Sequence, residues 1–197
     1  MFGKKGNIIL LIRTAQKKDA AQIVPLFKII LHEMELPALK IIPEKKLDQL
    51  IQYAFESDDL RFNIGKTLVA EIDGKVAGFA FGYSDELEEK VNNVWQKAVS
   101  LSDLPESTEL FSDDETLPNE WYLDSIAVSP AFQGKGVGTK LLNSLPEVAS
   151  KSGNTCIGLS VDFANPLAEK LYRRVGYQKV ATTVISQHQY HHMQLKI

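Results

Sequence analysis

Two hydrophobic periods divide the first half of the chain into strands and helices. Short apolar runs of β-type residues alternate with stretches in which apolar side chains recur every three or four positions, the spacing of one helix face. A hairpin is expected at Asp73-Gly74, because this pair tolerates positive φ in a tight turn. Asp19 is in position to cap the first helix. The expected elements are strands at 8–14, 67–71 and 75–82 and helices at 19–31 and 44–55.

The second half repeats these patterns more regularly. Gly136 opens a helical pattern to about Ser150, and Pro146 inside it should remove a backbone hydrogen bond and kink or shorten the helix near Leu142. Residues 155–161 are largely apolar, as in a strand covered on both faces. The element order predicts a mixed α/β fold. The other expected elements are strands at 121–128, 178–186 and 190–197 and a helix at 166–174.

An acidic segment separates the two halves. From Asp85 to Glu120 the chain holds eleven acidic residues and two lysines, a local charge of −9 that leaves the remainder at +6. Residues 86–101 fit a helix and 102–119 a loop, so we treat 85–119 as an insert. Such a segment is typical either of a solvated, poorly ordered loop or of a wall that attracts a cationic substrate. The basic remainder would suit an anionic cofactor.

The composition narrows the class of protein. With 197 residues, 44% hydrophobic and 24% charged, the chain suits one soluble domain spanning 1–197. Its net charge of −3 argues against a general nucleic-acid binder. The apolar run behind residues 1–7 is too short for a membrane span or a signal peptide, so we expect a cytoplasmic protein that binds no membrane. Cys156, the one cysteine, excludes an internal disulfide and is expected in the core.

The candidate ligand site is a glycine-rich loop at residues 133–139, Gln-Gly-Lys-Gly-Val-Gly-Thr, between a predicted strand and a predicted helix. Glycines let the backbone approach a ligand, and a helix N-terminus adds unsatisfied N–H donors and partial positive charge. Lys135 and Lys140 are placed to add charge at the rim. The pattern predicts an anion site, because a plain strand-to-helix turn would not need three glycines at alternate positions.

Neither common nucleotide motif fits this loop. A Walker loop requires Gly-Lys-Ser/Thr, whereas Gly138 is followed by Thr139 and Lys140. A dinucleotide fingerprint requires G-x-G-x-x-G in a first βαβ unit. Here the spacing is G-x-G-x-G, late in the chain and with no acidic residue about 20 positions further on. A nucleotide-binding protein is therefore disfavoured.

Three segments together resemble the GCN5-related N-acetyltransferase (GNAT) superfamily. They are the strand region 123–130, the loop 133–138, and residues 165–177, Asn-Pro-Leu-Ala-Glu-Lys-Leu-Tyr-Arg-Arg-Val-Gly-Tyr. The family signature, Gln/Arg-x-x-Gly-x-Gly/Ala, is met by Gln133, Gly136 and Gly138. The likeness is dense around these segments, weaker over the first half of the chain and absent from the acidic insert.

The resemblance implies a fold and a cofactor. The fold is a mixed, mostly antiparallel sheet with helices on both faces, in which the parallel strands 121–128 and 155–161 splay apart. The pantetheine arm of acetyl-CoA would insert between them, and N–H groups from Gly134 to Thr139 would hold its pyrophosphate. The implied cofactor-binding residues are Ile126, Ala127, Val128, Gln133, Gly134, Lys135, Gly136, Val137, Gly138, Thr139 and Asn165.

The resemblance further implies acetyl transfer to a primary amine, by direct attack on the thioester with the Val128 N–H as oxyanion donor. Tyr172 is the implied general acid near the sulfur, although an isolated tyrosine at helical spacing would be a core aromatic. Asp124 and Glu120 are candidate bases for the amine's proton, with water as a third possibility. Because alternate residues share a strand face, Asp124 is expected beside Ile126 and Val128.

Other interpretations stay open. The main alternative is a catalytically inactive CoA-binding sensor or interaction module, although a pure binder would not need Tyr172. The acceptor is a small amine or a protein amine, and a cationic one is favoured if the insert walls the site. A homodimer is compatible with the resemblance. His191 and His192 are adjacent on a predicted strand and face opposite sides, which argues against a shared metal ion.

Overall fold

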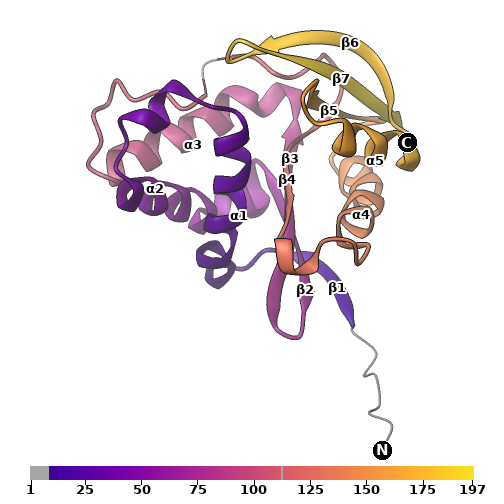
Figure 1. The fold of residues 1–197 in the computed structure, drawn as a ribbon, viewed down its shortest axis with the longest axis horizontal. Coiled ribbons are helices and arrows are strands. Elements are labelled where there is room, and N and C mark those ends of the chain that lie inside the picture. Colours follow the sequence, from indigo (N-terminus) through magenta and orange to yellow (C-terminus); the bar gives the residue numbers. More distant parts are fainter. Residues whose placement is uncertain (1–8, 112) are drawn as a thin grey trace, which may run out of the picture.

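The computed structural model describes residues 9–111 and 113–197, and its centre is a seven-stranded sheet (Figure 1). The strand order is β1-β2-β3-β4-β5-β7-β6, and neighbouring strands are antiparallel except for β4 and β5. The mixed, mostly antiparallel sheet predicted from the sequence is therefore confirmed. The strands are β1 (Leu10–Thr14), β2 (Lys66–Ile72), β3 (Lys75–Ser84), β4 (Trp121–Val128), β5 (Cys156–Asp162), β6 (Gln178–Ile185) and β7 (His188–Lys196).

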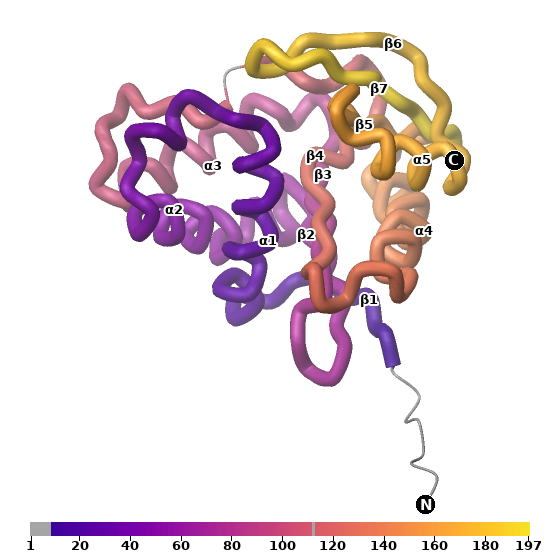
Figure 2. Tube along the Cα trace, viewed as in Figure 1, coloured from indigo at the N-terminus to yellow at the C-terminus, as the bar shows by residue number. Residues whose placement is uncertain are grey.

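Helices cover both faces of this sheet, as expected. In Figures 1 and 2, α1, α2 and α3 lie on one side of β2–β4, while α4 and α5 lie on the other. The helices are α1 (Ala20–Glu33), α2 (Glu44–Glu56), α3 (Glu88–Leu101), α4 (Val137–Lys151) and α5 (Pro166–Val175). Shorter helical turns lie at Lys17–Asp19, Pro37–Lys40, Asp59–Asn63, Asp85–Leu87 and Pro130–Phe132.

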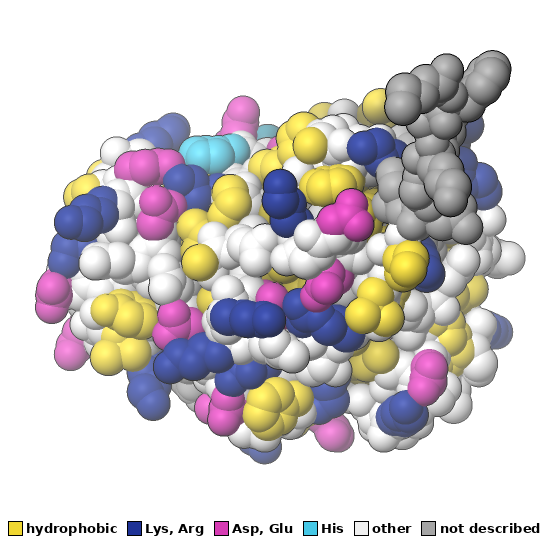
Figure 3. Space-filling model, turned by 90° about the horizontal axis from the view of Figure 1, so that it is seen from below, with side chains coloured by type: hydrophobic (Ala, Val, Ile, Leu, Met, Phe, Trp, Pro, Cys, Tyr) yellow, Lys and Arg dark blue, Asp and Glu magenta, His cyan; other side chains and the backbone are white. Residues whose placement is uncertain are grey.

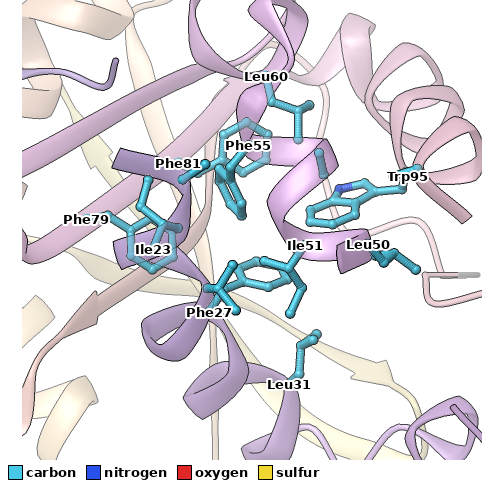
Figure 4. Close-up of a cluster of buried hydrophobic side chains, with 14 of the residues drawn as sticks. Ile23, Phe27, Leu31, Leu50, Ile51, Phe55, Leu60, Phe79, Phe81 and Trp95 are labelled. Carbon is cyan, nitrogen blue, oxygen red and sulfur yellow. The ribbon is translucent and has the colours of Figure 1, made fainter. Parts of the chain in front are cut away.

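Two apolar layers hold the helices on the sheet. Figure 4 shows the layer under α1, α2 and α3, where Phe27, Phe55 and Trp95 pack with ring centroids 5.1 to 5.9 Å apart. The second layer joins α4 to the other face through leucines such as Leu141, which is fully buried. The helix α4 runs on through Pro146 to its end at residue 151, so the predicted shortening is wrong.

The inner side of the acidic insert belongs to the first apolar layer. Trp95 of α3 is 4% exposed, and the ring of Phe111 packs edge-on against it with centroids 5.2 Å apart. Residues 102–119, as far as the structure describes them, hold neither helix nor strand, as predicted. The apolar side chains of Leu104, Leu110 and Phe111 pack on the first layer, so they anchor this loop to the core while its exposed residues stay solvated.

Two further side chains differ from expectation. The Asp19 carboxylate accepts the backbone N–H of Gln16 (2.7 Å) and pairs with Arg13 (2.6 Å), so it stabilises the turn before α1 and does not cap the helix. Cys156 is half-buried at the start of β5 and does not lie in the core. Residues 1–8, including the predicted start of the first strand, lie outside the described part. No helix in the described ranges is long and apolar enough to cross a membrane.

Candidate active site

The parallel strands β4 and β5 separate soon after they meet, which confirms the predicted splay. They pair only at Trp121↔Ile157 and Tyr122↔Gly158. Beyond these pairs a cleft opens between the strands, with the C-terminal end of α1 on one side and α5 on the other. Because both strands continue for several residues past the last pair, each presents a free edge to the cleft.

The β4 edge of this cleft has backbone groups available to a ligand. Ser129 donates its N–H to the carbonyl of Ala77 on the far side (2.9 Å). Since successive residues of a strand turn their N–H and C=O to opposite edges, those of Val128 and Ile126 point to the β5 side. The described residues offer them no strand partner there, and the Val128 carbonyl accepts only a 3.4 Å contact from the side-chain amide of Gln133. This edge can therefore hydrogen-bond an extended amide chain.

The cleft continues to the N-terminus of α4. Gly134 and Gly136 adopt φ of 73° and 79°, which favours glycine, and a Cβ on either would meet open space. No side chain caps the helix. The first N–H groups of a helix lack carbonyl partners, and here Val137, Gly138 and Thr139 line the cleft. The loop thus has the geometry of an anion site.

One positively charged residue that lines this end of the cleft was missed by the sequence reasoning. Lys135 donates to the carbonyl of Ala131 (2.9 Å) and Lys140 to the carbonyl of Leu10, and neither side chain lines the cleft. Arg174 lines the cleft instead, with its guanidinium 3.4 Å from Thr139 Oγ1. The two arginines directly after Tyr172 in the sequence could have indicated this positive charge. Elsewhere, over the lower face shown in Figure 3, basic and acidic side chains are interspersed.

Tyr172 projects from α5 to the junction of the two parts of the cleft. It is 9% exposed, and burial followed by the charge of Glu33 raises its pKa to about 12. The phenol therefore keeps its proton at neutral pH. Gln133 and Asn165 line the same junction. The Asn165 Oδ1 is already engaged, because it accepts the N–H of Ala168 (3.1 Å) and caps α5.

Asp124 is displaced from its predicted face by a β-bulge. On β3, Phe81 pairs with Ser125 and Gly82 with Leu123, so Asp124 is the extra residue of β4. The extra residue changes which side chains of β4 point to each face of the sheet. Asp124 accepts the hydroxyl of Tyr83 (3.3 Å), on the α1–α3 side, whereas Ile126 and Val128 pack against the layer under α4. The expected shared face is wrong, although all three residues line the cleft.

A small acidic pocket adjoins the cleft behind Asp124. We define it by Glu88, Asp113, Glu115 and Asp124, which line it together with aromatic side chains from α1, α3 and the insert. Burial raises the pKa of Asp124 to about 6, opposed by its hydrogen bonds from Ser125 and Tyr83. Burial and the neighbouring Asp124 charge raise the pKa of Glu115 to about 8. The pocket thus holds carboxyl groups that a bound cation would stabilise in their charged form.

Glu120 lines neither the cleft nor the acidic pocket. It is fully buried, and its carboxylate accepts hydrogen bonds from the Leu117 N–H (2.8 Å) and the Gln194 amide (2.8 Å) and contacts His192 (3.0 Å). His191 contacts Glu169 on the opposite face, as the sequence predicted for adjacent histidines. Within the described ranges no three His, Cys, Asp or Glu side chains gather as a metal site.

Comparison with known proteins identifies the family. The family model described as the acetyltransferase (GNAT) family matches residues 29–177, which include the glycine loop, α5 and every cleft-lining residue except Tyr190. The chain belongs to the GNAT family. One solved structure described as an acetyltransferase superposes with a TM-score of 0.83 at 43% identity, covering 95% of this chain and 99% of that one.

Two further proteins similar to this chain are described as N-acetyltransferases. An N-acetyltransferase structure from Staphylococcus aureus Mu50 has a TM-score of 0.79 at 29% identity, covering 94% of this chain and all of that one. The ribosomal protein bS18-alanine N-acetyltransferase of Haemophilus ducreyi is 37% identical over 70 residues, 36% of this chain and 48% of the relative. The first three curated relatives are matched over 17%, 48% and 39% of their own lengths.

Proposed function

We propose that this chain transfers the acetyl group of acetyl-CoA to the primary amine of a small molecule or protein, by direct attack, and that the acceptor carries further positive charge. The observation that carries the proposal is a row of adjoining hollows that share lining residues. It runs from the uncapped N-terminus of α4, between β4 and β5, to the acidic pocket. An anionic cofactor suits one end of this cleft and a cationic acceptor suits the other.

Acetyl-CoA would enter along the β4 edge. Its pyrophosphate would bind the N–H groups of residues 134–139, with the charge of Arg174 beside them. The pantetheine amides would pair with the edge groups of Val128 and Ile126 and complete the interrupted sheet. In this pose the thioester would lie near the point where Tyr172 reaches the cleft.

The residues around that point supply what amine acetylation requires. The attacking amine must lose a proton, and Asp124, with a pKa of about 6, is mostly ionised at pH 7 and able to accept it directly or through water. The N–H of Val128 would stabilise the oxyanion of the tetrahedral intermediate. Tyr172 would donate its proton to the departing thiolate. Glu120, the other candidate base, is excluded from the proposal because its carboxylate reaches neither cleft.

The acidic pocket supports a charged acceptor. A second ammonium group, several bonds from the attacking nitrogen, would reach Glu115 and its neighbours while the first nitrogen stays at Asp124. Burial makes these carboxyl groups costly to ionise alone, so the attraction between a cation and a carboxylate there is stronger than at an exposed carboxylate, against the cost of taking the cation out of water.

Thiol release from acetyl-CoA with a panel of amines tests the proposal. Diamines should exceed monoamines of equal chain length in kcat/KM, and initial-rate plots should intersect, because both substrates bind before transfer. Parallel plots with an acetylated enzyme in the mass spectrum would contradict direct attack. If CoA raises the melting temperature but no small amine or amine-bearing peptide accelerates thiol release, the chain is the inactive binding module instead.

A further inference from the structure

Three polar side chains form a chain from the buried interior of the sheet to the cleft. Ser160 on β5 pairs in register with His192 on β7, and Ser160 Oγ lies 3.2 Å from His192 Nδ1. The other ring nitrogen of His192 lies 3.0 Å from Oε2 of Glu120. Ser160 lines the cleft, whereas His192 and Glu120 are 1% and 0% exposed. The two buried members therefore reach the cleft only through Ser160.

The inner end of this chain is rigidly built. Besides contacting His192, the Glu120 carboxylate accepts hydrogen bonds from the Leu117 N–H and from the Gln194 amide, each at 2.8 Å. It packs directly on Gly158, where a Cβ would lie 2.0 Å from Oε2. The ring of Tyr122 stacks on the imidazole of His192, with an interplanar angle of 14°.

With a neutral His192 ring, this arrangement favours one direction for the Ser160 hydroxyl. A carboxylate only accepts, so the nitrogen of His192 that faces Glu120 carries the ring proton. In the neutral ring the other nitrogen is then an acceptor, and Ser160 donates its hydroxyl hydrogen to it. Ser160 also interacts with the Tyr122 phenol, so a remaining lone pair of Oγ is left to accept one hydrogen bond from the cleft side.

Ser160 and Asp124 lie at matching places on the two walls. Each follows the last parallel pair, Tyr122↔Gly158, by two residues, and both line the cleft where the strands begin to separate. We propose that Ser160, oriented by His192 and Glu120, accepts one N–H of the acceptor amine while Asp124 faces the same nitrogen from β4. A neutral primary amine that is held at both N–H groups keeps its lone pair free. In this orientation the lone pair would face the thioester.

The inference rests on the proposed function and assigns different roles to its members. Ser160 touches the acceptor, whereas His192 and Glu120 are positioning residues that act through it. No covalent step or additional reactant is needed, because the proton still leaves through Asp124. The consequence is that removing the Ser160 hydroxyl should impair use of the amine and leave acetyl-CoA binding unchanged.

Four variants test this inference in the full chain. Ser160→Ala should lower kcat/KM for the amine about tenfold, the value of one ordinary hydrogen bond, with an unchanged Kd for acetyl-CoA. Ser160→Thr, which restores a hydroxyl, should recover most of the loss. Ser152→Ala removes a serine hydroxyl directly after α4, outside the cleft, and His191→Gln changes the neighbouring histidine on the opposite face. Both should behave as the unaltered chain.

A double-mutant cycle separates positioning from mere stability. His192→Gln should reduce kcat/KM for the amine in the normal chain but add little in a Ser160→Ala background, because its effect passes through that hydroxyl. Equal effects of His192→Gln in both backgrounds, or full activity of Ser160→Ala, would overturn the inference while leaving the proposed function intact. If His192→Gln does not fold, the comparison of Ser160→Ala with Ser160→Thr still decides. An unaltered chain that acetylates no amine overturns both.

Discussion

Asp124→Asn should remove one ionisation from the pH dependence of acetyl transfer. In the proposed reaction, the active form requires a deprotonated Asp124, with a pKa of about 6, and a neutral amine, with a reference pKa near ~10. Below pH 6 both protons must be lost, so log kcat/KM should rise with slope 2. Between pH 6 and the amine pKa the slope should be 1. The asparagine variant should show slope 1 throughout.

The magnitude follows from the ionised fraction of the carboxyl group. With a pKa of about 6, roughly one tenth of Asp124 is ionised at pH 5 and roughly nine tenths at pH 7. The free-amine fraction rises about a hundredfold over the same range in both proteins and cancels in their ratio. The ratio of kcat/KM between the normal chain and the variant should therefore grow about tenfold from pH 5 to pH 7. The loss at pH 7 should reach about 100-fold or more, as for other general bases.

The stability of the variant provides the control. Burial raises the Asp124 pKa from 3.8 to about 6, so ionisation in the folded state is unfavourable. This cost begins as the pH rises above about 4 and is complete above about 6, where it reaches at most about 3 kcal/mol of unfolding free energy. Asp124→Asn should then be no less stable than the normal chain at pH 7.

The assay is chromatographic measurement of CoA, which works across the whole pH range. Acetyl-CoA is held at saturation, and the amine is varied between pH 5 and 8. A variant that keeps slope 2 below pH 6, or whose ratio to the normal chain stays constant, would refute the role of Asp124 as base. It would point to water or to another group.

Three further predictions concern single positions. Tyr172→Phe should lower kcat about 100-fold or more, while the Kd for CoA, measured by calorimetry, stays the same. A variant with the same kcat as the normal chain would refute Tyr172 as the general acid. Gly136→Ala forces a side chain to φ near 79° and should cost roughly 1–2 kcal/mol in denaturant unfolding, whereas Gly138→Ala meets only ordinary contacts at 3.6 Å and should fold normally. Equal unfolding midpoints for these two would contradict the strain at residue 136. Gly158→Ala should lower the free energy of unfolding by about 3 kcal/mol, because the new methyl group overpacks against Glu120. The double variant with Glu120→Ala should lose less stability than the two single variants added together. Additive losses would mean that the two side chains do not compete for the same space.

The fold was predictable because its signals are local. Hydrophobic period and turn residues located every helix and strand to within a few residues, and the Asp73-Gly74 turn joins β2 to β3 as expected. The glycine loop was predictable because positive φ at residues 134 and 136 and an uncapped helix follow from residue type and spacing.

The side chains of the site were less predictable because they depend on contacts between distant segments. The bulge at Asp124 arises from register with β3, and no pattern within β4 announces it. The turning away of Lys135 and Lys140 depends on nearby carbonyls. Burial of Glu120 requires β7, more than 70 residues later. Sequence periodicity reports which face a residue prefers, but not which partner it meets there.

A crystal structure of this chain with CoA or acetyl-CoA is the most direct test of the account. The pyrophosphate should lie against the N–H groups of residues 134–139 beside Arg174, and the pantetheine should run between β4 and β5. Its sulfur should then lie within reach of the Tyr172 hydroxyl and the Val128 N–H. A ligand bound elsewhere, or side chains that close the space between β4 and β5 in the complex, would contradict the account.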